Sequence, residues 1–233
     1  MPKRKKNAQR SSAAPLLVLA VALIGVIWAT EQITARGVGP SWLQFLFAGK
    51  PTGGLDVVII AGHKGNDSGA VCTDGLTEAE VNLEVAKLVA DALGREGMRV
   101  EIMDEFDRRL RGLRANALVS IHADSCESSF SGFKVASEEG GTVDSERLAN
   151  CLWDKYEAAT DLPRNYDTIT TNMTNYHAFR EISLTTPAAI IELGFLKSDR
   201  ELLTEEPQKV ANGVANGILC FLTPSTTAQG NQK

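Results

Sequence analysis

The chain has 233 residues, of which 43% are hydrophobic and 23% charged, a composition typical of one globular domain of moderate size. Its formal net charge is −5, and setting aside the five basic residues among the first ten leaves −10 on the remainder. This acidic balance argues against nucleic acid as a partner, because contacts to phosphates need clustered lysine and arginine.

The N-terminus combines a basic stretch, residues 1–12, with an uncharged apolar one, residues 13–30. About 18 apolar residues can cross a hydrocarbon core of about 30 Å, and a basic flank stays in the cytoplasm. We therefore predict a cytoplasmic tail at 1–12 and a single transmembrane signal-anchor at 13–30, with the rest of the chain outside the cytoplasm. One alternative is a cleaved signal peptide and secretion, although no clear small-x-small cleavage site follows the apolar run. A buried core helix is disfavoured by the adjacent basic patch.

Two further segments have a composition that predicts chain outside the folded domain. Residues 31–54 contain several glycines and prolines that break regular structure, which predicts a linker. Residues 223–233 are polar and are predicted to form a disordered tail. The folded domain is accordingly expected at 55–222.

Strands and helices alternate along this domain. Short apolar, β-branched runs predict strands, and apolar residues at helical spacing predict helices. The expected strands are 55–62, 98–104, 117–123, 131–137 and 187–195, the fourth being more exposed than the others. The expected helices are 77–97, 143–160 and 208–222, with a short one near Tyr176.

The helix starts carry capping signals. Thr77 and Glu80 form a T-x-x-E capping box, and Asp144 or Ser145 is the expected cap of the next long helix. The alternation predicts an α/β fold of three layers, in which helices cover both faces of a mainly parallel sheet. Functional sites of such sheets lie at the carboxyl ends of the strands.

Side chains that can bind a metal or transfer a proton lie at or near the predicted carboxyl ends of the strands. His63 follows the first strand, His122 lies at the end of the third, and Glu78 begins the first helix. Two imidazoles and a carboxylate are a standard ligand set for catalytic Zn²⁺. Each histidine could instead be a hydrogen-bonded structural residue, and Glu78 could simply favour the helix dipole. The sequence pattern also leaves other carboxylates open as the ligand, namely Asp67, Asp74, Asp124 and Glu80.

Glu192 lies within the apolar strand AAIIEL. A carboxylate in such a strand loses its hydration, which costs several kcal/mol unless the group is paired or neutralised. Glu192 is therefore expected either in a buried ion pair or in catalysis.

Four segments carry a resemblance to a known family. They read GHKGNDSGA (62–70), EAEVNL (78–83), SIHAD (120–124) and ELGFLKS (192–198). In this order they resemble the motifs of the zinc-dependent N-acetylmuramoyl-L-alanine amidases of bacterial cell walls, and the resemblance covers residues 55–222. Any one motif alone is weak, but four in the family's order are strong.

The resemblance implies that His63, Glu78 and His122 are the zinc ligands and that Glu192 is the catalytic residue. In the implied mechanism, zinc polarises the lactyl amide and activates water, while Glu192 moves a proton from water to the leaving L-alanine amine. The substrate would be peptidoglycan, cleaved between N-acetylmuramic acid and L-alanine by a monomer. A catalytically silent or autoinhibited wall-binding or regulatory relative, and a zinc hydrolase of another bond, are the alternatives.

The chain departs from the family pattern near the first and third ligands. Lys64 replaces a glycine, Ser68 a proline, and Asp124 an asparagine. Lys64 is a candidate for binding an anionic peptide. His177 and Arg180, in NYHAFRE, are candidates for substrate contact, although His177 could be a packed surface residue.

The cysteine count is four, which outside the cytoplasm suggests disulfides. Four cysteines allow three pairings, and the absence of C-x-x-C makes a thiolate zinc site improbable. Cys72 lies between two implied ligands and Cys126 lies just beyond the third. We hypothesise a Cys72–Cys126 bond beside the metal and a Cys151–Cys220 bond between two helices.

Overall fold

The computed structural model describes residues 55–126 and 129–223. The predicted tail 1–12, signal-anchor 13–30 and linker 31–54 lie outside these ranges, as do residues 224–233. Among the helices that are described, none is long and apolar enough to cross a membrane. All of the described helices and strands fall between residues 55 and 222.

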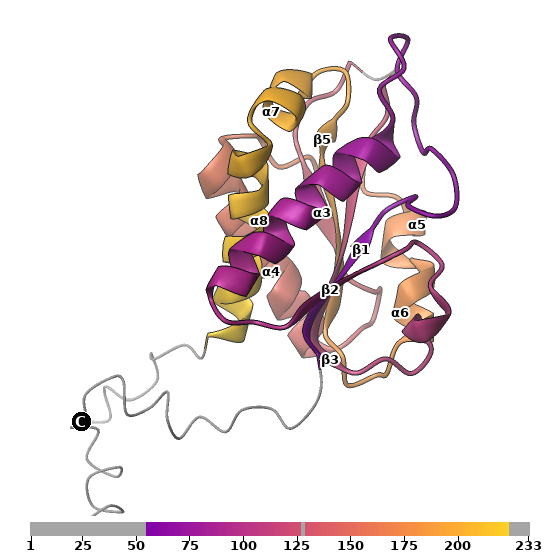
Figure 1. Cartoon of the computed structure of the whole chain (residues 1–233), viewed down its shortest axis with the longest axis vertical. Helices are drawn as coiled ribbons and strands as arrows, with labels where there is room; N and C mark the ends of the chain where they lie inside the picture. The colour runs from indigo at the N-terminus through magenta and orange to yellow at the C-terminus, as the bar shows by residue number, and fades with distance from the viewer. Residues whose placement is uncertain (1–54, 127–128, 224–233) are drawn as a thin grey trace, which may run out of the picture. The chain divides into compact units, whose positions relative to one another are not determined.

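A five-stranded sheet runs through the centre of the described domain (Figure 1). Its order is β2-β1-β3-β5-β4, and only β4 is antiparallel to its neighbour. The bounds are β1 Leu55–Ala61, β2 Val100–Met103, β3 Ala115–Asp124, β4 Lys134–Ala136 and β5 Ala188–Phe195. The inner strands are almost wholly apolar because helices cover the sheet on both faces. The expected mainly parallel α/β sheet is thus observed.

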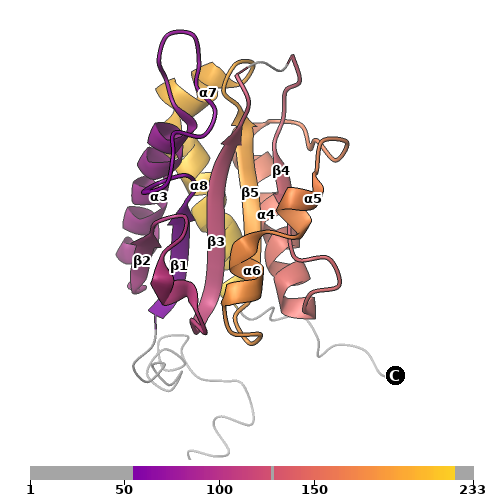
Figure 2. The same cartoon turned by 90° about the vertical axis from the view of Figure 1, so that its right-hand side faces the viewer.

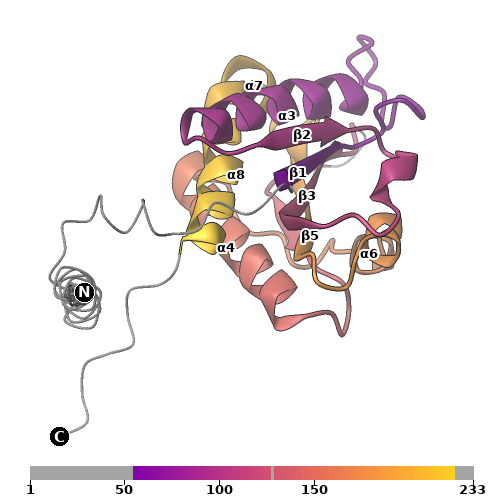
Figure 3. The same ribbon diagram turned by 60° about the horizontal axis from the view of Figure 1, so that its bottom comes forward.

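Three long helices cover one face, α3 (Glu78–Arg95), α4 (Val143–Thr160) and α8 (Pro207–Leu222). They lie on the opposite side of the sheet from α6, as Figure 3 shows. The capping box of Thr77 and Glu80 is present at the start of α3, as predicted. The predicted cap of α4 is wrong: Thr142 caps it, because its hydroxyl accepts the Ser145 backbone N–H.

In the described domain the other face carries the short helices α5 (Thr171–Thr174) and α6 (His177–Glu181) (Figure 2), together with the turn that contains Leu110. Met173, Tyr176 and Phe179 from this segment pack on alternate strand residues such as Ile60 and Ile190. The helix expected near Tyr176 is therefore observed, as α6. A short helix α7 (Arg200–Glu205) precedes α8, and Arg108–Leu110 form a 3₁₀ turn.

The edge strand β4 is more buried than its sequence predicted. All three of its residues are buried. Val135 belongs to the core under the long helices, while Lys134 on the opposite face forms an ion pair with Asp124 and donates to the Thr168 carbonyl. The alternation of apolar and polar residues predicts an exposed strand, whereas the polar position, Lys134, is covered by the segment before α5.

Candidate active site

The site residues come from the carboxyl ends of neighbouring strands. His63 follows β1, His122 lies near the end of β3, and Glu192 lies in β5 directly opposite His122 in the strand register. Alternation along β3 directs Leu118 and Ser120 toward the face of α6, and His122 continues this series. His122 therefore lies on the sheet face that carries the short helices.

Glu78 lies between the two histidines. Its Oε1 is 3.2 Å from His63 Nε2 and 3.1 Å from His122 Nδ1. One ligand atom from each of the three residues lies within 4.8 Å of the other two. Two imidazole nitrogens and a carboxylate oxygen that converge in this way fit a zinc ion with one further coordination position.

The turn after β1 has the conformation that this convergence needs. His63 adopts a left-handed backbone conformation with φ of 66°, which is uncommon for a residue with a side chain. Gly62 leaves room for the His122 ring, since a Cβ there would lie 2.6 Å or less from three ring atoms. Gly69, with φ of 61°, likewise gives space to the Glu78 carboxylate.

A layer of hydrogen bonds orients Glu78 and His63. Glu78 accepts the backbone N–H groups of Ala70 (3.1 Å) and Ala123 (3.3 Å) and the Asn82 amide (3.3 Å). His63 Nδ1 lies 2.5 Å from Asp67 Oδ1. A carboxylate on the outer nitrogen of a ligand histidine fixes its tautomer and raises its basicity.

The three side chains shift one another's pKa values. The hydrogen bond to Glu78 raises the pKa of His63 to about 9 against the effect of burial. Burial opposes ionisation of Glu78, but its hydrogen bonds to His122 and His63 outweigh burial and hold its pKa far below the usual range. The pKa of His122 is also raised, because Glu78 and neighbouring carboxylates outweigh its burial. The negative charge of these carboxylates favours a bound cation.

Glu192 differs from the other carboxylates in the site. Its Oε2 is shielded from solvent and has no hydrogen-bond partner among the described residues. Burial raises its pKa to about 7, while the positive charges of His122 and Lys134 oppose this rise. A carboxylate that titrates near neutral pH is suited to accepting and returning a proton.

Sequence reasoning missed Glu105. It is buried, and its carboxylate contacts the backbone N–H of His63, the Tyr176 hydroxyl and the His177 ring. Burial raises the pKa of Glu105, but the hydrogen bond to His177 and the charge of His122 outweigh it and bring the pKa to about 2. The available signal was its position, directly after the second strand and so at the same sheet edge.

The other candidate carboxylates have different partners. Asp67 lies on the outer side of His63, and Glu80 completes the capping box. Asp74 pairs with Arg200, and Asp124 pairs with Lys134. The arrangement therefore singles out Glu78 as the carboxylate between the two histidines.

The three predicted substrate contacts have different surroundings. Lys64 forms an ion pair with Asp104, and Arg180 donates to the backbone and side-chain oxygens of Asn175. Both cations are therefore engaged with neighbours other than the candidate ligands. His177 is closer to the cluster, since Glu105 connects it to His63.

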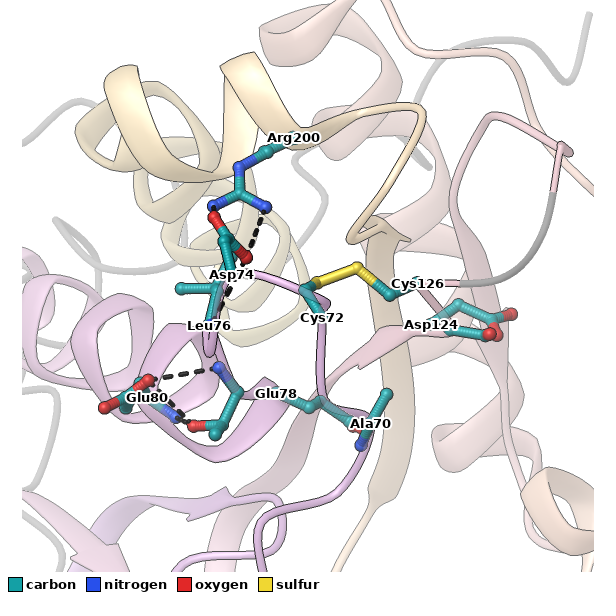
Figure 4. Close-up of a disulfide and its surroundings, with 11 residues drawn as sticks. Ala70, Cys72, Asp74, Leu76, Glu78, Glu80, Asp124, Cys126 and Arg200 are labelled. Carbon is teal, nitrogen blue, oxygen red and sulfur yellow. Dashed lines mark hydrogen bonds and ion pairs between the residues drawn. A yellow bond between two sulfur atoms is a disulfide. The ribbon is translucent and has the colours of Figure 1, made fainter.

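The disulfides join Cys72 to Cys126 and Cys151 to Cys220, the pairing hypothesised from the sequence. The first connects the loop before Glu78 to the segment after β3 (Figure 4). The same loop is held to α7 by the ion pair between Asp74 and Arg200, drawn in the same view. Two segments that carry candidate ligands are thus tied together covalently.

Known proteins share these features. The profile of the N-acetylmuramoyl-L-alanine amidase family matches residues 57–220. The uncharacterized protein YqiI of Bacillus subtilis (strain 168) is 31% identical over 187 residues, 73% of this chain and 86% of that protein. The germination-specific N-acetylmuramoyl-L-alanine amidase of the same strain is 29% identical over 201 residues, 74% of this chain and 82% of that protein.

A solved structure has the same fold. The catalytic domain of CwlV, an N-acetylmuramoyl-L-alanine amidase from Bacillus(Paenibacillus) polymyxa var.colistinus, matches with a TM-score of 0.55 and 28% identity. The match covers 72% of this chain and 98% of that domain. Because the family profile matches residues 57–220 and one relative is 31% identical, this chain belongs to the N-acetylmuramoyl-L-alanine amidase family.

Proposed function

We propose that this protein is a peptidoglycan hydrolase that cleaves the amide bond between N-acetylmuramic acid and the L-alanine of the stem peptide. His63, Glu78 and His122 would hold a zinc ion, and Glu192 would move the proton. The observation that carries the proposal is the Glu192 carboxylate, whose Oε2 is shielded from solvent and has no hydrogen-bond partner among the described residues, beside two imidazoles and a carboxylate that converge. When bound, zinc supplies a Lewis acid that activates water and polarises the amide carbonyl.

The protein residues would perform the remaining steps. Glu192 accepts a proton from the attacking water and donates it to the nitrogen of L-alanine as the carbon–nitrogen bond breaks. Its partly buried position suits this exchange, because burial brings its pKa to about 7. Asp67 holds His63 in one orientation through Nδ1, which leaves Nε2, the nitrogen that faces Glu78, for the metal.

We further propose roles for the flanking residues. Lys64, His177 and Arg180 would contact the substrate, His177 from the face that carries α6. Residues 13–30 would anchor the chain in the bacterial cell membrane, with a monomeric domain acting outside the cytoplasm. The basic residues before them support this orientation. Cleavage after that segment would instead release the domain as a secreted enzyme.

The test incubates the full-length protein with purified peptidoglycan and zinc. New L-alanine amino termini and new reducing sugar ends are measured together. We expect alanine termini without reducing ends, and loss of the product after chelation and in the Glu192→Gln variant. Glu101→Gln is the matched control, because Glu101 lies on β2 and pairs with Arg109. Zinc binding without any product would favour a silent or autoinhibited relative, and a different new terminus would indicate another bond.

A further inference from the structure

Glu105 is one of the few carboxylates buried in the described domain, with 5% of its surface exposed. It belongs to the loop after β2 rather than to any of the family motifs quoted above. Its two oxygens point to different parts of the molecule. One contacts the candidate metal ligands, and the other contacts the segment around α6.

The Oε2 atom of Glu105 connects the two histidines. It accepts the backbone N–H of His63 at 2.8 Å and lies 3.5 Å from His122 Nε2. That His122 nitrogen is buried and forms no hydrogen bond within the described residues, while Nδ1 of the same ring faces Glu78. A metal on Nδ1 leaves the proton on Nε2, which then needs an acceptor. A shift of about 0.5 Å would bring Glu105 Oε2 to hydrogen-bonding distance.

The contact with His63 acts on the backbone. A left-handed conformation is strained for a residue with a Cβ, so it persists only where the surroundings hold it. His63 has this conformation, and its N–H points to Glu105. In turn, the Glu105 backbone N–H donates to the Lys64 carbonyl at 3.0 Å. These bonds join the loop after β2 to the turn after β1 from both sides.

The Oε1 atom of Glu105 is held by two donors. The Tyr176 hydroxyl donates to it at 2.7 Å, and His177 Nε2 lies 3.1 Å away. The same Tyr176 hydroxyl accepts a hydrogen bond from Ser120 on β3 at 3.0 Å. The carboxylate therefore cannot rotate without breaking contacts to the sheet and to α6.

We propose that Glu105 is a positioning residue of the metal site, which orients His122 through Nε2 and His63 through its backbone, with Tyr176 and His177 as its supports. Glu105 is not itself a ligand in this assignment, because its Oε2 faces the outer nitrogen of His122. The inference rests on the zinc site of the proposed function. It goes beyond that function because it explains how the two imidazoles keep the geometry that zinc requires.

The decisive variant is Glu105→Gln in the full-length protein. Both carboxylate oxygens of Glu105 face hydrogen-bond donors. In glutamine one of these oxygens is replaced by an NH₂ group, which would face a donor and could not accept its hydrogen bond. Loss of such an outer partner typically lowers metal affinity 10- to 100-fold. Zinc Kd is measured by competition with a chromophoric chelator. The Co²⁺-loaded protein is compared by visible absorption, which reports the ligand geometry.

We expect Glu105→Gln to raise the zinc Kd at least 10-fold and to change the Co²⁺ spectrum, while Glu101→Gln leaves both within twofold of the parent. A zinc Kd and spectrum unchanged in Glu105→Gln would overturn the inference. If that variant does not fold, the Tyr176→Phe variant provides the test, because it removes the hydroxyl that donates to Glu105 and leaves the Glu105 carboxylate in place. Its zinc Kd should rise about threefold, and an unchanged value would overturn the inference. A parent protein that binds no zinc would instead refute the proposed metal site itself.

Discussion

The two disulfides provide a matched pair of perturbations with different expected effects on the metal site. Cys72 and Cys126 are 54 residues apart, and Cys151 and Cys220 are 69 residues apart. In the chain-entropy model, closing loops of these lengths stabilises the folded state by about 4 kcal/mol in each case. Replacing either pair by alanine should therefore lower the free energy of unfolding by a similar amount.

Only the first disulfide is close to the candidate ligands. The loop that contains Cys72 holds Glu78 through two bonds, Ala70 N–H to Glu78 Oε2 at 3.1 Å and Glu78 N–H to the Ala70 carbonyl at 2.9 Å. Cys126 lies four residues after His122. The second disulfide joins α4 and α8, which carry none of the candidate ligands.

We expect Cys72→Ala/Cys126→Ala to raise the zinc Kd at least tenfold, because both ligand segments gain freedom that zinc binding must remove. Cys151→Ala/Cys220→Ala should leave the zinc Kd within about twofold of the parent at a temperature where all three proteins are folded. Urea unfolding of the metal-free proteins checks that the two variants lose similar stability. Equal zinc affinities in the two variants would refute the reasoning that the first disulfide orders the metal site.

Three further predictions concern the site. Glu192→Gln should abolish hydrolysis and stabilise the metal-free protein. The pKa of Glu192 is about 7 in the folded state and 4.5 in the unfolded state, so the parent loses about 3 kcal/mol of unfolding free energy as pH rises from below 4.5 to above 7. Denaturant unfolding of parent and variant at several pH values would measure this difference. Since the pKa of His63 is about 9, zinc must displace its proton, and the zinc Kd should fall at least about tenfold per pH unit between about pH 6 and 8. Calorimetry that detects no proton release on binding would contradict this. Gly62→Ala should raise the zinc Kd at least tenfold by displacing the His122 ring, whereas Gly94→Ala, with nothing within 4 Å of the added Cβ, should not.

The elements could be predicted from the sequence because their signals are local, whereas Glu78 as a candidate ligand was implied only by the resemblance to the amidase family. The capping box at Thr77 depends only on Glu80, three positions further along the chain. The apolar run of β1 indicates a strand that is buried on both faces. His63 and His122 are recognisable because parallel strands bring their carboxyl ends to one edge. In each case the relevant physical interaction acts within a few residues, or follows from a rule common to all parallel sheets.

The partners of the charged residues were decided only by tertiary structure. Glu105 lies 42 residues from His63 and 72 from His177, and nothing in the local pattern indicates that its carboxylate contacts both. Lys134 looked like an exposed strand residue, yet its side chain is buried beside Asp124. Hydrogen bonds and ion pairs depend on distances of a few ångströms between side chains far apart in the chain. Those distances are defined only when the loops have packed against the sheet.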